Sequence, residues 1–219
     1  PGTHTVVVPN PDLKPEKSLN YEAGSSFKAD GVFGSDDHLF AKAVFFYDDV
    51  KDFIAPKGWF EPTTPPTVYY SSQNVGHVVR KGIELSGTYA AGQFSTSVSY
   101  GLLHAVDKET NERMNGITPQ SANLKLAYAF PAQAINVWYR AHWSKGGESS
   151  VEDRATGKNL HFSSFLTHSL GAEWSPKVAD LANLQAGIAV VNLFDKEYRM
   201  LNGSYGSGRG VRLWLSAQF

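Results

Sequence analysis

The sequence predicts an all-β protein: an antiparallel β-barrel that crosses a membrane. The first observation is that apolar and polar residues alternate with a period of two over most of the 219-residue chain, as in β-strands. The second is the composition: 13 Phe, 10 Tyr, 5 Trp and 20 Gly favour pleated strands and tight turns. The third is strand length, because most alternating segments exceed the about 9–11 residues that a tilted strand needs to cross a bilayer.

Nine strands account for the alternation. In the segment 121–130, for example, Leu124, Leu126 and Tyr128 fall on one face, whereas Lys125 and Ala127 fall on the other. A helical period does not explain this pattern. The nine predicted strands lie at residues 17–28, 40–54, 74–90, 93–107, 117–130, 134–145, 160–175, 183–199 and 208–219.

The connections between these strands are of two kinds. Those after the third, fifth and seventh strands are short, at residues 91–93, 131–133 and 177–183. Those after the second, fourth, sixth and eighth are longer and rich in charge, Gly or Pro. Short turns at one end and long loops at the other are typical of outer-membrane barrels. The segment after the first strand, ADGVFGSDDH, is longer than a tight turn and is the one departure from this layout.

A soluble β-sandwich is the alternative fold, since its strands also alternate. Two features favour the barrel. The apolar faces run for four or five positions without interruption in every strand, which would require an unusually tall sandwich core. The opposite faces are polar but rich in Ser, Gly, Ala and Asn, as the lumen of a barrel allows. Aromatic residues near strand ends also suit the interfacial girdles of a membrane barrel.

Charge and motif content exclude several classes of function. The formal net charge of −1 gives no reason to expect a nucleic-acid partner, and the absence of Cys removes disulfides and thiolate metal sites. No apolar stretch is long enough for a transmembrane helix, and residues 1–10 do not form a signal peptide, so we expect the leader of an exported protein to lie upstream. No G-x-S-x-G or H-E-x-x-H motif occurs. The sequence therefore predicts no enzyme, no catalytic residue and no resident cofactor or metal.

Three motifs carry a resemblance to a known family. The segment NPDLKPEKSLNYEAG (10–24) resembles the entry into a late barrel strand of TonB-dependent outer-membrane receptors. The segment NVGHVVRKGIELSGTY (74–89) is similar to an intermediate strand, and VVNLFDKEYR (190–199) followed by GRGVRLWLSAQF (208–219) is similar to the last two strands. The resemblance implies a barrel of twenty-two strands around an N-terminal plug, located in the outer membrane of a Gram-negative bacterium. It also implies import of scarce ligands with energy supplied by the TonB complex, with membrane lipid around the barrel.

Strand counting places the chain within such a barrel. If both ends of the barrel face the periplasm, the last strand descends, and with nine strands the first must descend as well. Residues 1–16 are then the end of an extracellular loop, and residues 17–219 are the C-terminal part of the barrel, strands fourteen to twenty-two. We expect the plug and the first thirteen strands to lie outside this sequence. The resemblance also assigns Phe219 as the signal that the barrel-assembly machinery reads.

Within the family, haem and haemophore receptors carry a histidine in the external loop just before an NPNL-type box. His4 stands in that position here, before NPDL, with Asp12 where Asn is often found. Neutral imidazole is a good axial ligand for haem iron, and Val6, Val7 and Val8 could contact the porphyrin. The resemblance therefore implies haem as the transported ligand, delivered free or by haemoglobin or a haemophore. On its residues alone, His4 is an ordinary loop histidine, and the NPDL box is turn chemistry that positions the loop.

Aromatic residues of the long loop after the second strand are further candidates. Trp59, Phe60, Tyr69 and Tyr70 could stack on a porphyrin or a siderophore, or could be packing anchors of the loop. The other histidines have no spacing that demands a metal. A ferric-siderophore receptor with the same barrel is the main alternative function, and a passive porin or adhesin is a more distant one.

Overall fold

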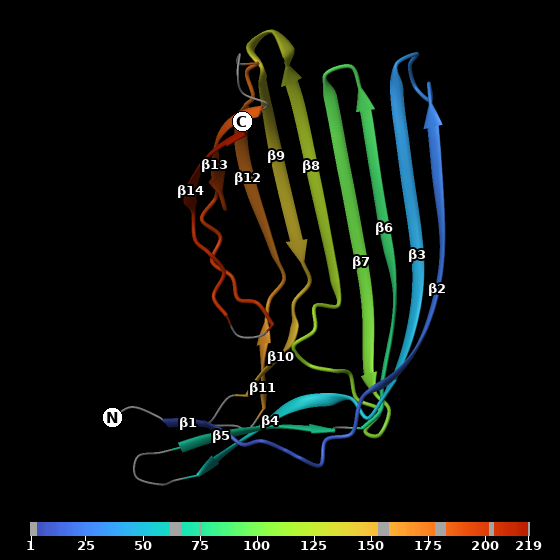
Figure 1. The fold of residues 1–219 in the computed structure, drawn as a ribbon, viewed down its shortest axis with the longest axis vertical. Helices are drawn as coiled ribbons and strands as arrows, with labels where there is room; N and C mark the ends of the chain where they lie inside the picture. The colour runs from blue at the N-terminus through green and yellow to red at the C-terminus, as the bar shows by residue number, and fades with distance from the viewer. Residues whose placement is uncertain are drawn as a thin grey trace. The chain divides into compact units, whose positions relative to one another are not determined.

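The main sheet of the computed structural model contains nine strands in the order in which they follow one another along the chain (Figure 1). The structure describes residues 4–61, 67–74, 76–152, 158–177, 183–201 and 204–218. All five strand pairs whose register is defined within this sheet are antiparallel. The prediction of nine consecutive antiparallel strands is therefore confirmed. The strands are β2 (Lys17–Asp30), β3 (Asp37–Lys51), β6 (Val78–Ala91), β7 (Phe94–Asp107), β8 (Gln120–Phe130), β9 (Ile135–Ser144), β12 (Phe165–Trp174), β13 (Asn183–Val191) and β14 (Gly210–Gln218).

Two smaller sheets lie mainly in segments that the sequence assigned to loops; the exception is residues 159–162, most of which fall in the predicted strand 160–175. The first has the order β1-β5-β4, with β1 (His4–Val7), β4 (Ile54–Glu61) and β5 (Thr67–Asn74). The second is an antiparallel pair of β10 (Gly147–Glu152) and β11 (Asn159–Phe162). Contacts divide the chain into two compact units, which are Pro1–Glu22, Phe46–Lys81 and His104–Met114, and Ala23–Phe45, Gly82–Leu103 and Asn115–Phe219.

Two predicted strands differ from the observed ones. The segment 160–175 is divided into β11 and β12, and the segment 183–199 ends as a strand at Val191. The second difference has a clear cause at Asn192, whose backbone adopts a φ of 48°. Its side-chain amide donates hydrogen bonds to the carbonyl oxygens of Lys196 and Ser207, at 2.9 and 3.0 Å. These bonds fold the chain into a turn where strand alternation alone suggested a continuation.

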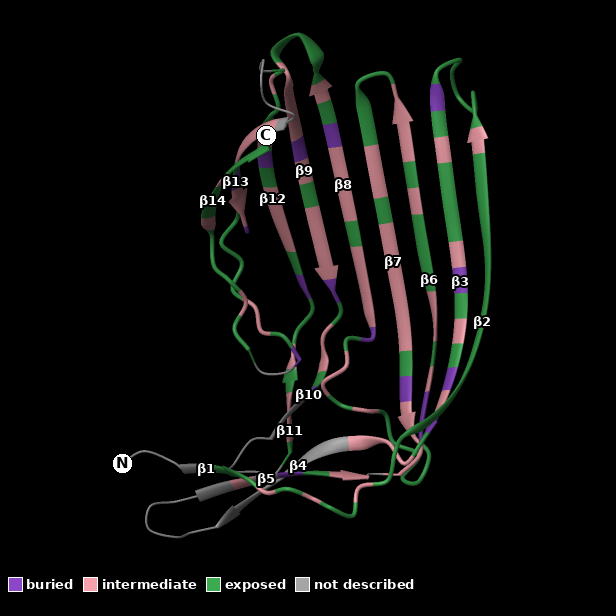
Figure 2. Cartoon of the chain, viewed as in Figure 1, coloured by how far each residue is buried: buried purple, intermediate pink, exposed green. Residues whose placement is uncertain are grey.

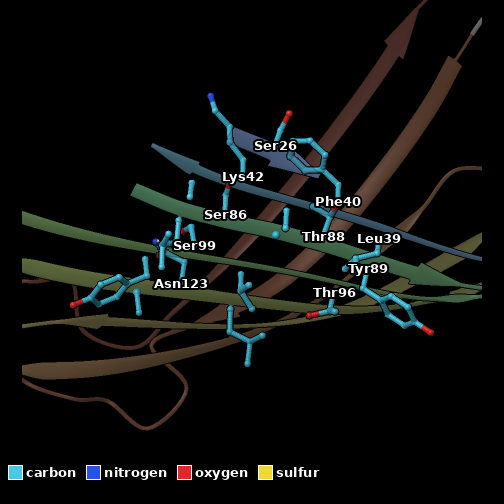
Figure 3. Close-up of a pocket in the computed structure, with 18 of the residues that line it drawn as sticks. Ser26, Leu39, Phe40, Lys42, Ser86, Thr88, Tyr89, Thr96, Ser99 and Asn123 are labelled. Atoms are coloured by element: carbon cyan, nitrogen blue, oxygen red, sulfur yellow. Dashed lines mark hydrogen bonds between the residues drawn. The ribbon is translucent and has the colours of Figure 1, made fainter. Parts of the chain in front are cut away.

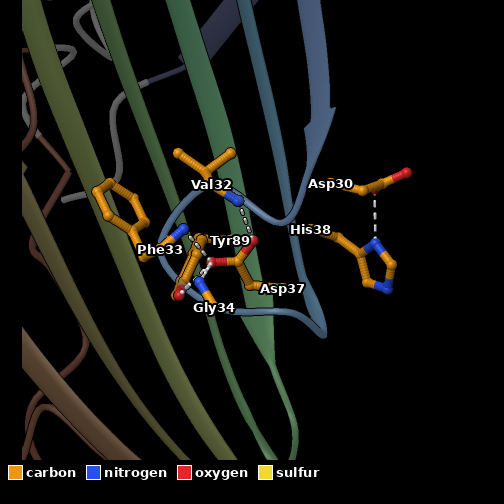
Figure 4. Close-up of polar contacts among 7 residues, drawn as sticks. All are labelled: Asp30, Val32, Phe33, Gly34, Asp37, His38 and Tyr89. Carbon is orange, nitrogen blue, oxygen red and sulfur yellow. Dashed lines mark hydrogen bonds and ion pairs between the residues drawn. The ribbon is translucent and has the colours of Figure 1, made fainter.

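The connection between β2 and β3 is organised by one carboxylate (Figure 4). The Asp37 side chain is buried and accepts hydrogen bonds from the backbone N–H groups of Val32, Phe33 and Gly34, at 2.6, 2.7 and 3.0 Å. It also accepts a bond of 3.1 Å from the hydroxyl of Tyr89 on β6. This connection, which the sequence marked as too long for a tight turn, is therefore an ordered turn. The turn between β6 and β7 contains Gly92, which has a φ of +55°. The turn between β8 and β9 consists of a 3₁₀ turn at Pro131–Gln133 followed by Ala134 in the left-handed region.

Most of the large exposed apolar side chains on the strands of the second unit share one face of the sheet. Leu213 and Leu215 on β14 are 75% and 76% exposed, and Leu166, Leu170 and similar residues on other strands are also exposed. We call this the apolar face; Figure 2 shows exposed and more buried stretches succeeding one another along β3 and β8, whereas β2 is exposed almost throughout. A soluble sandwich would bury such rows against a second layer, whereas a barrel in lipid exposes them. The structure therefore supports the barrel interpretation.

The opposite face, here called the polar face, carries a small buried cluster. Ala127, Trp138 and Ala189 are buried there, and Trp214 packs against them. Gly171 and Gly187 make this packing possible, because a Cβ at Gly171 would overlap the indole of Trp138 and one at Gly187 would overlap that of Trp214. Among the described residues, no helix is both long enough and apolar enough to span a bilayer.

Candidate functional site

Register places the predicted haem ligand on the three-stranded sheet of the first unit. Strand β1 pairs in parallel with β5, so that His4 lies opposite Thr67 and Val6 lies opposite Tyr69. Strand β4 pairs antiparallel with the other edge of β5, and there Trp59 lies opposite Tyr69. Val6, Tyr69 and Trp59 therefore form one row across the three strands. Residues two apart in a strand belong to the same face, so the position of His4 lies on the same face of the sheet as this row.

The structure thus brings all five predicted site positions into one sheet. Phe60 lies opposite Val68, and Tyr70 lies opposite both Val7 and Gly58, so these positions belong to the other face. The side chain of Tyr69 is half-buried. The side chains of the other four predicted residues are not among those that the structure describes. These residues are His4, Trp59, Phe60 and Tyr70. Their roles remain predictions.

The NPDL box links the segment that follows β1 to β5 through hydrogen bonds. The side-chain amide of Asn10 donates to the carbonyl oxygen of Ser72 at 3.0 Å, and its oxygen accepts from the backbone N–H of Asp12 at 3.1 Å. Further along, the Asn74 side chain accepts from the N–H of Lys14 at 2.8 Å and donates to the Lys14 carbonyl oxygen at 2.9 Å. These contacts agree with the positioning role that turn chemistry predicts for the box.

Most of the other histidines have a polar partner. His77 lies 2.7 Å from a carboxylate oxygen of Asp49, and His38 and His161 contact Asp30 and Glu148 in the same way. His168 lies on the apolar face and is 2.6 Å from the hydroxyl of Tyr139. No cluster of three or more His, Cys, Asp or Glu side chains suited to a metal ion occurs among the residues that the structure describes. These histidines therefore do not form a second metal-binding candidate.

A large apolar hollow of about 970 Å³ occurs along β2, β3, β6, β7 and β8 and extends to β9 and β12. Most of its lining belongs to the apolar face, and small residues such as Ala41 and Gly87 are part of it. Figure 3 shows Tyr89 and Thr96 on one side of these strands and Lys42 and Ser86 on the other. Because the apolar face meets lipid in a membrane barrel, acyl chains fill such a hollow, and we do not assign it to an imported ligand.

A second hollow, of about 550 Å³, is lined mainly by the polar face. Lys125 on β8 and Arg140 on β9 both contribute to it, and the two residues lie directly opposite each other in the sheet. Sequence analysis placed Lys125 on the polar face of its strand but did not pair it with Arg140. The signal that would have paired them is the register of the hairpin between β8 and β9, which alternation leaves undetermined.

Comparison with known proteins agrees with this architecture. A family model described as "TonB dependent receptor-like, beta-barrel" matches residues 1–193. The chain is 25% identical over 210 residues to the heme/hemopexin utilization protein C of Haemophilus influenzae strain 86-028NP, a match that covers 94% of the chain and 29% of that protein. It is 24% identical over 215 residues to the hemin receptor of Yersinia pestis, covering 97% of the chain and 30% of the relative.

Solved structures resemble the chain in fold. The copper transporter OprC superimposes with a TM-score of 0.71 at 19% identity, over 94% of this chain and 31% of that one. At such low identity the likeness concerns the fold alone. The chain spans less than a third of the length of the relatives it matches.

Proposed function

The chain belongs to the TonB-dependent receptor-like β-barrel family, and from that premise we propose that it forms part of a receptor that binds and imports haem. The receptor would lie in the outer membrane of a Gram-negative bacterium, with its apolar face against lipid. Import would draw on energy delivered by the TonB complex through parts of the receptor outside this sequence. The haem would arrive free or on a carrier such as haemoglobin or a haemophore.

The observation that carries this proposal is the register of the β1–β5–β4 sheet. It places the backbone of His4 on the same face as Tyr69 and Trp59, two of the aromatic positions expected to contact a porphyrin. Imidazole supplies an axial nitrogen to haem iron, and aromatic rings pack against the porphyrin plane. Two neighbouring valines add apolar surface, since Val6 is 39% exposed and Val7 is 76% exposed.

The names of several relatives support the same ligand. The proteins from Haemophilus influenzae and Yersinia pestis are named for heme, hemopexin or hemin. We assign the NPDL box a supporting role, because its contacts hold β1 against β5 and so fix where His4 lies. Assembly of the barrel would use the C-terminal Phe219, which lies outside the described residues.

A ferric-siderophore receptor is the alternative, and it predicts that His4 has no part in ligand binding. The decisive experiment is a haem titration of the full-length receptor and its His4→Ala variant, followed by absorption spectroscopy. We expect the variant to bind haem at least about tenfold more weakly, a change of about 1.4 kcal/mol, and to lose the spectrum of the ligated iron.

The matched control is His38→Ala. This histidine is exposed, lies at the turn between β2 and β3, and contacts Asp30. We expect the control to bind haem as the unmodified receptor does. A His4→Ala variant with unchanged affinity and spectrum would remove His4 from the role, and an unmodified receptor that does not bind haem would remove the function itself.

A further inference from the structure

The polar hollow contains two like charges that face each other. Lys125 and Arg140 are direct register partners on β8 and β9, at the middle of each strand. Among the described residues, neither side chain forms an ion pair with a carboxylate. Like charges directly opposite each other in a sheet repel, so this arrangement costs stability unless an anion lies between or above them.

The register partners of the two cations on the flanking strands are polar and neutral, whereas Glu173 and Arg212 line a separate hollow that Arg140 also borders. Ser97 lies opposite Lys125 on β7, and Ser169 lies opposite Arg140 on β12, so one row across four strands reads Ser97–Lys125–Arg140–Ser169. The guanidinium of Arg140 also lies over the ring of Trp138, 4.5 Å from its centroid. This cation–π contact positions the guanidinium next to the indole, and the group has five N–H donors in all with which to bind a ligand.

The next row continues the same chemistry. Asn123 lies opposite both Ser99 and His142, and Thr167 lies opposite His142. The Asn123 side chain donates to the Ser99 hydroxyl at 3.1 Å, and His142 Nδ1 lies 2.8 Å from the Asn123 oxygen. Hydroxyl, amide and imidazole groups can all donate hydrogen bonds to an anion. No carboxylate lines this hollow in the part of the chain that the structure describes.

We propose that the row of Lys125 and Arg140 is a carboxylate-binding site on the inner wall of the barrel, where it takes the two propionate groups of haem during import. The proposal rests on the proposed function. Arg binds carboxylates through paired N–H donors and Lys through a point charge, so two neighbouring cations suit a ligand with two carboxylates. The small hydroxyl side chains around them leave the hollow open, and they can reorient as an anion arrives and leaves.

The test uses the full-length receptor in cells that depend on external haem. Uptake of haem is compared with uptake of haem dimethyl ester, in which both carboxylates are neutral. In the Lys125→Gln/Arg140→Gln double variant we expect haem uptake to fall about tenfold or more. Uptake of the dimethyl ester, and equilibrium binding of haem at the cell surface, should stay unchanged.

Two controls make the result specific to this site. Lys42→Gln removes a cation from the polar side of β3, where Figure 3 shows Lys42 beside Ser86, and it should leave uptake of both ligands unchanged. The Arg140→Lys variant keeps both positive charges, so we expect it to retain much of the haem uptake that the double variant loses. The amount of folded receptor at the cell surface is measured for every variant and used to normalise the rates.

Three outcomes would overturn the proposal. Unchanged haem uptake in the double variant would show that the cations have no role in import. An equal fall for haem and for its dimethyl ester would assign Lys125 and Arg140 to contacts within the receptor, such as pairing with acidic residues of the plug. An unmodified receptor that imports neither ligand would instead contradict the proposed function, and the carboxylate site with it.

Discussion

Substitution of Trp138 tests whether the buried cluster on the polar face stabilises the barrel wall. The Trp138 side chain is 5% exposed and packs with Ala127 and Ala189. Replacement of a buried Trp by Ala typically costs about 3–5 kcal/mol, because apolar contact is lost and a cavity remains. Loss of the stacking with Arg140 adds about 0.5–1 kcal/mol. We therefore expect Trp138→Ala to destabilise the folded wall by about 3.5–6 kcal/mol.

The Trp138→Phe variant separates ring packing from the indole N–H. This N–H is buried and has no hydrogen-bond partner among the described residues. Its removal relieves a desolvation penalty of about 1–3 kcal/mol, which offsets the smaller contact area of Phe. We therefore expect Trp138→Phe to cost clearly less than Trp138→Ala.

A double-mutant cycle with Gly171 completes this test. A Cβ at Gly171 would overlap the Trp138 indole and lie 2.9 Å from the Ile188 carbonyl oxygen. Gly171→Ala alone should therefore cost about 1–3 kcal/mol, as overpacking does. In the Trp138→Ala background the indole is absent, so the same change should cost less, with a coupling of about 0.5–3 kcal/mol.

The assay for these variants is urea unfolding of the full-length receptor in lipid vesicles. Folded and unfolded fractions are separated by gel mobility, which does not depend on the tryptophan that is replaced. If Trp138→Phe is as costly as Trp138→Ala, the indole N–H has a partner and the reasoning fails. If the effects of Trp138→Ala and Gly171→Ala simply add, the Trp138 indole does not lie against Gly171 as the structure places it.

Two further predictions concern a loop and a turn. Asn74→Ala removes the hydrogen bonds between the Asn74 side chain and the Lys14 backbone. We expect haem affinity to fall several-fold, with urea unfolding of the barrel unchanged. Equal haem affinity would show that these bonds do not position the site. Asp37→Ala removes the acceptor of three backbone N–H groups in the turn at residues 31–36, so hydrogen exchange of these amides should accelerate. The control is Asp36→Ala, at an exposed neighbouring position, which should leave the exchange rates of these amides unchanged. Slow exchange in Asp37→Ala would mean that the turn is held by other contacts.

The nine strands were predictable because long alternation is a local property of the sequence. Each strand of the main sheet lies within a segment whose apolar residues recur at every second position, and Gly or Pro marks most turns. The end of β13 was not predictable in this way. Residues 192–199 contain further apolar residues, but the turn depends on hydrogen bonds from Asn192 to residues 4 and 15 positions away.

The candidate site was only partly predictable, because the alternation of polar and apolar residues within a strand does not determine which distant strand it pairs with. His4 and the loop aromatics could be chosen from the sequence, but the parallel pairing of β1 with β5 joins segments about sixty residues apart. The opposition of Lys125 and Arg140 depends on a connection of four residues between β8 and β9. Its last residue, Ala134, has a φ of 54°, and a connection one residue shorter would shift the register and pair Lys125 with Tyr139 instead.

The two proposed contacts discriminate differently between haem and a siderophore. A siderophore that surrounds ferric iron with its own oxygen ligands leaves no coordination position for imidazole, whereas haem iron keeps axial positions free. An effect of His4 on the spectrum of the iron therefore argues for haem. The cations Lys125 and Arg140 would attract any anionic ligand, and only the comparison of haem with its dimethyl ester connects them to propionate groups. The iron spectrum must therefore identify the ligand first, and the uptake ratio can then show which part of that ligand the inner wall recognises.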